Sequence, residues 1–285
     1  MAKLMRENEE GKTKNTYQFT ISSDPSDVLA KVISGEYDVA ALPTNTAAAA
    51  YAKSDKAVQM LAINTYGTLY LLQNTELEPE PLTDLSQLAG KTIVAFGQGA
   101  NPEYILDYVL TQNGLTVGEN VTVSFSATAE EVLTAAAAGT AAFVMLPEPS
   151  ASVLRSKNDA MITAFDLTKV WDDCAESPLV MGSLVVSAAF AKAHPDAIAA
   201  FLDEYAASVD DIKNNPKEAA AWIASYGIVP NESIAAAALE NCNLTCITGT
   251  AMQETIEGYY QILFDYNPSA VGGAIPDEAF YYTGA

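Results

Sequence analysis

Polar side chains and glycines stand in turns that directly follow predicted strands, and these residues are the best placed to do chemistry. The candidate ligand-binding residues in these turns are Ser22, Ser23, Thr44, Asn45, Tyr66, Gly97, Gln98, Gly99, Asn101, Pro147 and Glu148. In open α/β sheets, ligands bind beyond the carboxyl ends of the strands and next to helix N-termini. Hydroxyl, amide and backbone groups in that position can orient a small molecule by hydrogen bonds.

The turn at residues 96–102 offers its backbone as a binding group. Gly97 and Gly99 allow a ligand to approach closely, and the free N–H groups of the following helix favour an anionic or hydrogen-bond-accepting group. A plain tight turn is the alternative. A dinucleotide site is not indicated, because Pro102 stands where the third glycine of that motif is required.

The other turns have structural alternatives as well. Thr44 or Asn45 could cap the helix that follows them, while the neighbour faces a ligand. Glu148 stands between two prolines and could either face a ligand or stabilise a helix N-terminus by its charge. Tyr66 could stack on a ligand ring or pack in the core.

Catalytic signatures are weak in this sequence. His194 is the only histidine, and it precedes Pro195 at a predicted helix start, which indicates a structural role. No P-loop, zinc-hydrolase or nucleophile-elbow pattern is present. Cys242 and Cys246 could close a small disulfide loop or be ordinary thiols, and with Cys174 they make a poor metal pattern. We therefore expect a binding protein without enzyme activity, cofactor or metal.

The charge of the chain excludes some partners. The 285 residues include 36 Asp and Glu against 14 Lys and Arg, for a formal net charge of −22. Such a chain repels nucleic-acid phosphates and anionic lipid head groups. No apolar run approaches the roughly 20 residues of a membrane-spanning helix, and the charged N-terminus has no signal-peptide pattern.

Short apolar strands alternate with helical stretches, which indicates an α/β fold with mainly parallel sheets. Two prolines among acidic residues at 76–82 are typical of a linker. We therefore expect two lobes, residues 1–74 with 185–285, and residues 75–184. Two crossovers between them would form a hinge, with the ligand in the cleft between the lobes.

Two terminal segments carry further expectations. Residues 17–22 read as a strand, from their alternation and β-forming side chains. The aromatic tail that ends at residues 280–282 is expected to pack on a lobe, since a disordered tail would be polar.

Four stretches together resemble the type II solute-binding proteins of ABC importers. They are Ser-Gly-Glu-Tyr-Asp-Val-Ala-Ala-Leu-Pro at 34–43, Leu-Ser-Gln-Leu-Ala-Gly-Lys-Thr-Ile at 85–93, the His-Pro-Asp helix start at 194–202, and the aromatic tail at 271–282. The group most similar to this chain is the NMT1/THI5-like set, which includes binding proteins for sulfonates, nitrate and thiamine precursors. The resemblance implies a two-lobed type II periplasmic-binding-protein fold that spans nearly the whole chain.

The resemblance also implies partners and a location. Family members capture a small molecule, deliver it to an ABC permease in the membrane, act as monomers, and in one branch are extracellular lipoproteins. They normally begin with a signal sequence, a lipid-bearing cysteine and a first strand with a glycine-rich loop. Because none of these is visible, this chain is expected to be truncated and to lack that first strand.

Two other function classes share the fold. Some fungal relatives are pyrimidine-precursor synthases that use a histidine and a cysteine-rich motif, which the lone His194 and the scattered cysteines do not reproduce. Ligand-sensing effector domains would carry an N-terminal helix-turn-helix, and none is indicated.

Overall fold

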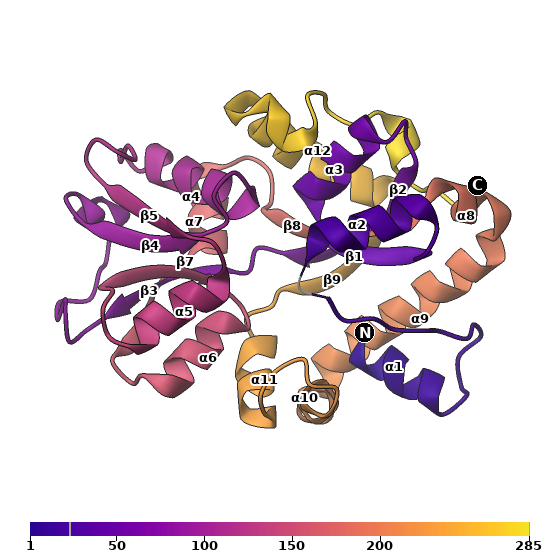
Figure 1. The fold of residues 1–285 in the computed structure, drawn as a ribbon, viewed down its shortest axis with the longest axis horizontal. Helices are drawn as coiled ribbons and strands as arrows, with labels where there is room; N and C mark the ends of the chain where they lie inside the picture. The colour runs from indigo at the N-terminus through magenta and orange to yellow at the C-terminus, as the bar shows by residue number, and fades with distance from the viewer. Residues whose placement is uncertain (23, 285) are drawn as a thin grey trace. The chain divides into compact units, whose positions relative to one another are not determined.

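The computed structural model describes residues 1–22 and 24–284, and they form two compact units. Unit 1 comprises Met1–Tyr66, Val180–Leu239 and Asn243–Ala285, and unit 2 comprises Gly67–Leu179 and Glu240–Cys242. The chain thus passes between the units at residues 66/67 and 179/180 and again around residues 240–242. Figure 1 shows both units and labels their elements.

Unit 1 is built on a four-stranded sheet in the order β1-β8-β2-β9. The strands are β1 (Val39–Pro43), β8 (Val180–Ser187), β2 (Val58–Tyr66) and β9 (Leu244–Thr248). All three described pairings in this sheet are antiparallel, so the expectation of mainly parallel sheets is wrong here. The reason is that β1 and β2 run in the same direction but are separated by β8, which enters from the other unit.

Helices cover both faces of this sheet. They are α1 (Ala2–Glu9), α2 (Pro25–Ser34), α3 (Thr44–Lys53), α8 (Ala188–Ala193), α9 (Pro195–Asn214), α10 (Pro216–Ser225), α11 (Glu232–Leu239) and α12 (Gly249–Tyr266). On one face, α1 and α9 enclose a core with Leu61, Leu184 and Phe201 among its buried side chains. Burial of such side chains supplies most of the stability of the unit.

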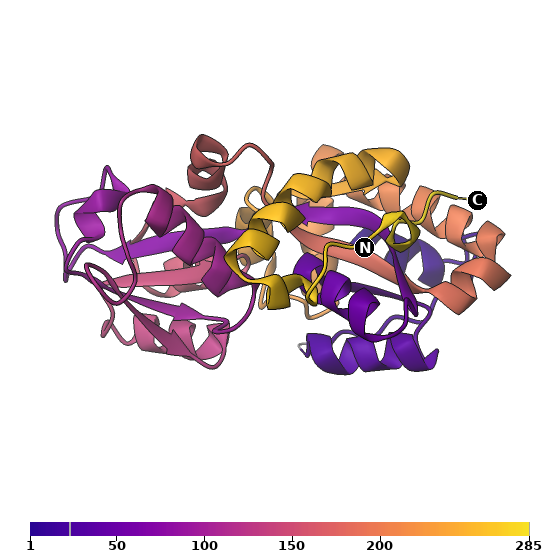
Figure 2. The same ribbon diagram turned by 90° about the horizontal axis from the view of Figure 1, so that it is seen from above.

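The aromatic tail packs on unit 1, as predicted. Phe280 is fully buried, and its ring lies 5.0 Å from that of Tyr51 on α3 and 6.5 Å from that of Tyr260 on α12. The backbone N–H of Tyr282 donates to the Met60 carbonyl of β2 at 2.9 Å. Figure 2 shows this last segment in yellow running over the unit.

Residues 17–22 do not form the predicted strand; they have no regular secondary structure. Their hydrogen bonds go to a side chain instead of a neighbouring strand, because Asn8 accepts from the Tyr17 N–H at 2.8 Å and donates to the Tyr17 carbonyl at 3.0 Å. The Tyr17 ring packs on Phe19 and Phe201. The aromatic residues that suggested a strand therefore anchor an extended segment.

Unit 2 contains a five-stranded sheet in the order β5-β4-β6-β3-β7. The strands are β3 (Leu69–Asn74), β4 (Thr92–Phe96), β5 (Thr122–Ser126), β6 (Phe143–Pro147) and β7 (Met161–Asp166). Strand β4 is parallel to β5 and β6, while β3 is antiparallel to β6 and β7. The carboxyl ends of β4, β5, β6 and β7 consequently lie at one edge of the sheet.

The helices of unit 2 follow its strands. They are α4 (Asn101–Gln112), α5 (Ala129–Ala137), α6 (Ser150–Lys157) and α7 (Leu167–Cys174), preceded by a short 3-10 turn at Leu85–Leu88. The sequence predicted lobe boundaries at residues 74 and 184, whereas β3 pairs within the sheet of unit 2 and β8 within that of unit 1. Both strands are mainly apolar and largely buried, so their sequences do not show which sheet they join.

The polypeptide bends at positions that its sequence marks. Asp24 caps α2 by accepting from the N–H groups of Ser26 and Asp27, and Pro25 occupies the first helical position. Gly35 ends the same helix with a left-handed φ of 77°, which favours glycine.

In the described part of the chain, no helix is long and apolar enough to cross a membrane.

Candidate functional site

The carboxyl ends of β1 and β2 lie at the same edge of the unit 1 sheet. The register shows this, because Pro43 is paired with Gly182 and Tyr66 with Val180 at the start of the intervening β8. Three predicted site residues, Thr44, Asn45 and Tyr66, stand at this edge, which we call edge 1. The strand order therefore brings together residues from two separate turns of the sequence.

Thr44 is fully buried, and its hydroxyl and carbonyl groups are hydrogen-bonded within unit 1. Its hydroxyl donates to the Val180 carbonyl at 2.7 Å, and its own carbonyl accepts from the Tyr260 hydroxyl at 2.9 Å. It does not cap α3, whose N-cap residue is Pro43 and which begins without a side-chain cap. Thr44 thus fastens the start of α3 to β8 and α12.

Asn45 differs from its neighbour. Its side chain is only 8% exposed, and its Oδ1 atom is buried without a hydrogen-bond partner among the described residues. An unpaired buried amide oxygen costs free energy, of the order of 1–3 kcal/mol. Such a group in a native fold calls for an explanation, and a bound water, ion or ligand is one. Asn45 is therefore the strongest binding candidate of unit 1.

The remaining predicted residues of unit 1 give weaker indications of ligand binding than Asn45. Tyr66 is half-buried, its N–H donates to the Asn243 carbonyl at 3.1 Å, and burial raises the pKa of its hydroxyl. Ser22 is exposed, and its hydroxyl accepts from the Asp24 N–H at 3.2 Å, next to the start of α2. Ser23 lies outside the described residues.

The corresponding edge of unit 2, which we call edge 2, carries the other predicted residues. The loop after β4 has left-handed backbone at Gly97 and Gly99, with φ of 78° and 73°. A Cβ atom on Gly97 would lie 2.8 Å from the Pro102 ring, so only glycine fits there. Gln98 is exposed, and Asn101, the first residue of α4, is 2% exposed.

Two backbone groups of this loop are already hydrogen-bonded to side chains of α4. The Gly99 N–H donates to the Glu103 carboxylate, and the Gly99 carbonyl accepts from the Tyr104 hydroxyl at 2.8 Å. The loop that was expected to present free N–H groups therefore has one of them already bound to an acidic side chain.

Glu148, after Pro147 at the end of β6, is tied into unit 2. Its fully buried side chain accepts from the Ser152 N–H at 3.1 Å and hydroxyl at 3.0 Å, and from Arg155 at 3.1 Å. Burial raises the pKa of this carboxyl, against the lowering effect of the Ser152 and Arg155 contacts. The contact with the Ser152 N–H places this carboxylate at the start of α6, and its contact with a ligand stays a prediction.

Sequence reasoning missed further carboxylates at edge 2. Glu131 accepts from the Ala127 N–H at 2.9 Å, while Thr128 accepts from the Glu131 N–H at 3.2 Å. Asp166 accepts from the Thr168 N–H at 3.0 Å. The Thr-x-x-Glu spacing at 128–131 is a readable capping-box signal, whereas α7 was not predicted and Asp166 had no such signal.

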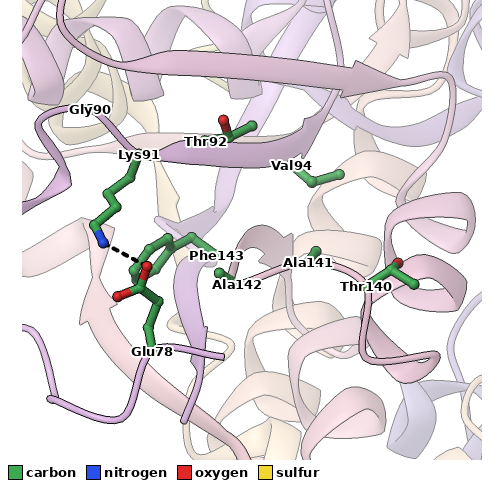
Figure 3. A pocket seen from close by; sticks show the side chains of 9 residues that line it. All are labelled: Glu78, Gly90, Lys91, Thr92, Val94, Thr140, Ala141, Ala142 and Phe143. Carbon is green, nitrogen blue, oxygen red and sulfur yellow. Dashed lines mark hydrogen bonds and ion pairs between the residues drawn. The ribbon is translucent and has the colours of Figure 1, made fainter. Parts of the chain in front are cut away.

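A separate cavity lies at the opposite edge of the unit 2 sheet, where β4 and β6 begin. Its volume is about 390 Å³, and Thr92, Thr140 and Phe143 line it with the ion pair of Lys91 and Glu78, whose atoms are 2.6 Å apart. Figure 3 shows this pair beside the cavity. No predicted site residue lines it.

The groups considered for catalysis or metal binding do not assemble. The His194 ring, at the start of α9, packs against Phe190 with the ring centroids 4.6 Å apart and the planes tilted by 42°. The three cysteines are free thiols, and burial raises the pKa of Cys242 to about 12. Within the described residues, no cluster of His, Cys, Asp and Glu could hold a metal ion.

Comparison with solved structures shows which fold this is. A structure of an ABC transporter from Parabacteroides distasonis superposes with a TM-score of 0.79 at 24% identity, covering 93% of this chain and 88% of the other. The alkanesulfonate-binding protein SsuA from Xanthomonas axonopodis pv. citri, bound to MOPS, gives 0.69 at 16% identity over 97% and 89%.

A third structure agrees. The periplasmic aliphatic sulphonate-binding protein SsuA from Escherichia coli gives a TM-score of 0.73 at 15% identity, covering 97% of this chain and 86% of that one. A search among curated proteins found no match. The model of the family described as NMT1/THI5 like matches residues 18–219. The chain is therefore a member of the NMT1/THI5-like family and has the two-lobed α/β fold of periplasmic solute-binding proteins.

Proposed function

We propose that this chain is the solute-binding component of an ABC importer, that it binds a small molecule and that it catalyses no reaction. Family membership and the fold of the sulfonate-binding structures support a binding role. Capture by closure of two lobes about a hinge, and delivery to a membrane permease by a monomer, belong to the same proposal. So does a location outside the cytoplasm, with a lipid anchor as in the related lipoprotein branch.

One observation supports a particular residue as a ligand contact. The Asn45 amide is nine-tenths buried, has an unpaired Oδ1 within the described chain, and stands at the carboxyl end of β1. This is the place where α/β sheets bind ligands. Edge 2 provides the corresponding position in unit 2, with Gly97, Gly99 and Asn101.

A thermal-shift screen tests the proposal. The purified chain would be heated with sulfonates, nitrate, pyrimidines, amines, amino acids and aromatic carboxylates. A ligand at a hundred times its dissociation constant stabilises a protein by about 2.7 kcal/mol, which moves the melting temperature visibly. We expect one chemical class to raise it. A cooperative melt that no class of compound shifts would contradict the proposed binding function.

The enzyme alternative is tested in the same samples. A pyrimidine-precursor synthase would convert or consume a small molecule, so mass spectrometry of the incubated ligand would reveal a new product. We expect the ligand to be recovered unchanged. His194 packs against Phe190 at the start of α9, and this helix does not begin at edge 1 or at edge 2.

A further inference from the structure

A three-residue loop, Glu240–Cys242, belongs to unit 2, although the chain on both sides of it belongs to unit 1. The loop lies between α11, which ends at Leu239, and β9, which begins at Leu244. The chain must join the units at residues 66/67 and 179/180, because it passes there from one unit to the other. The loop 240–242 leaves unit 1 and returns to it, so its own contacts are what attach it to unit 2.

Two side chains of unit 2 bind the middle of this loop. The Tyr70 hydroxyl, on β3, donates to the Asn241 carbonyl at 2.9 Å. The Glu148 carboxylate, directly after β6, accepts from the Asn241 side-chain amide. The next residue, Cys242, lies close to the same carboxylate, since burial and then the charge of Glu148 raise the pKa of its thiol to about 12. Asn241 is thus held through its backbone and its side chain.

The Glu148 carboxylate is itself fixed within unit 2. It accepts from the Ser152 N–H and hydroxyl and from Arg155, and Arg155 also donates to the Thr163 hydroxyl at 2.7 Å. Hydrogen bonds to a buried charged group are stronger than those between neutral groups. The carboxylate is therefore a firm attachment point for the Asn241 amide.

On the unit 1 side, the loop returns next to the two places where the chain passes between the units. The Tyr66 N–H donates to the Asn243 carbonyl at 3.1 Å, and Tyr66 is paired with Val180 on the neighbouring β8. Val180, Tyr66 and Asn243 therefore form a row across β8, β2 and the start of β9 at edge 1. Neighbouring strands are about 4.8 Å apart, so this row spans roughly 10 Å.

We propose that Glu148 and Tyr70 hold the loop 240–242 as a clasp, which allows the units to bend about this row and resists a twist between them. Three attachments in a row resist twisting more than two adjacent ones, because the outer attachments lie farther apart. Glu148 is then a positioning residue of the hinge. The inference rests on the hinge closure of the proposed function, and it adds an attachment that can open without a break in the chain.

An exchange of side chains between positions 148 and 241 tests the attachment. Asn241→Asp places a second carboxylate beside Glu148, and the two like charges should release the loop. We expect amide hydrogen exchange in residues 240–244, measured by mass spectrometry, to become about tenfold faster. Glu148→Gln combined with Asn241→Asp restores a donor and an acceptor in exchanged positions, so its exchange should be slower than that of Asn241→Asp alone.

Asn113→Asp is the matched control, because Asn113 is an exposed asparagine of unit 2 whose amide donates to the Val109 carbonyl at 2.8 Å. Exchange at residues 240–244 that is no faster in Asn241→Asp than in this control would overturn the inference. A combined variant that exchanges as fast as Asn241→Asp would overturn it as well.

Small-angle X-ray scattering of the chain without ligand tests the effect on the units. Tyr70→Phe removes the hydroxyl that binds Asn241, and Tyr108→Phe is its control, because the Tyr108 hydroxyl donates to the Cys174 carbonyl at 3.4 Å in the same unit. We expect a wider distribution of interatomic distances in Tyr70→Phe and in Asn241→Asp, and an unchanged one in both controls. Faster exchange of the loop with unchanged scattering would show a local contact only and would overturn the clasp.

Circular dichroism checks that each variant is folded, and Tyr70→Phe is used for both measurements if Asn241→Asp does not fold. Neither measurement uses a ligand, so the result is separate from that of the binding screen. A chain that binds a compound of the screen but shows neither change would keep the proposed function and lose the clasp. A chain that shows both changes but binds no compound would keep the clasp and lose the proposed function.

Discussion

The two sheet edges differ in how their polar groups are used. At edge 2, the acidic side chains are bound to backbone N–H groups of unit 2, and Glu148 is joined to Ser152 and Arg155 as well. At edge 1, Asn45 is buried with its oxygen unpaired within the described chain, beside Thr44, which is fully paired. The polar groups of edge 2 thus bind one another, whereas edge 1 contains a buried amide oxygen that has no partner among the described residues and that we propose a ligand satisfies.

The largest effect on stability is expected at Glu148. Glu148→Ala leaves Arg155 without its carboxylate partner and the Ser152 N–H without an acceptor. Breaking a buried pair of this kind costs about 3 kcal/mol. Urea unfolding of the variant and of the exposed control Glu119→Ala would measure the difference. A loss no larger than that of the control would show that Glu148 is not a structural residue.

A smaller effect is expected at Thr44. Thr44→Val keeps the shape of the side chain and removes the hydroxyl that donates to the Val180 carbonyl. The lost buried hydrogen bond should lower the free energy of unfolding by about 1 kcal/mol. The adjacent, half-buried Thr46 provides the control, since Thr46→Val should change it by less than about 0.5 kcal/mol. Equal values for the two variants would contradict the assignment.

The sequence predicted the positions of the binding turns better than the use of their side chains. A turn follows β1, β4 and β6 where expected, because apolar strands, glycines and prolines are local signals. The partner of Thr44 is Val180, which is distant in the sequence, so no local pattern could show that the threonine is occupied. The role of Glu148 depends on Ser152 and on Arg155, four and seven residues further along, so the sequence left both of its roles open.

Sequence patterns predicted a wrong structure for two segments whose conformation depends on a residue or strand distant in the sequence. The apolar strand β3 gave no sign that it belongs to the sheet of unit 2. Residues 17–22 have the side chains of a strand, yet the Asn8 side chain takes the Tyr17 backbone hydrogen bonds. Strand formation requires a neighbouring strand as well as a suitable pattern.

Titration calorimetry on Asn45→Ala, paired with urea unfolding, tests the central claim most directly. Wild type, Asn45→Ala, Asn101→Ala and the exposed control Asn215→Ala would be titrated with the best ligand of the screen. We predict that Asn45→Ala weakens binding roughly tenfold, while its unfolding free energy does not fall, because the change removes a buried oxygen that has no hydrogen-bond partner in the described chain. Unchanged affinity in Asn45→Ala would contradict the claim that edge 1 binds the ligand.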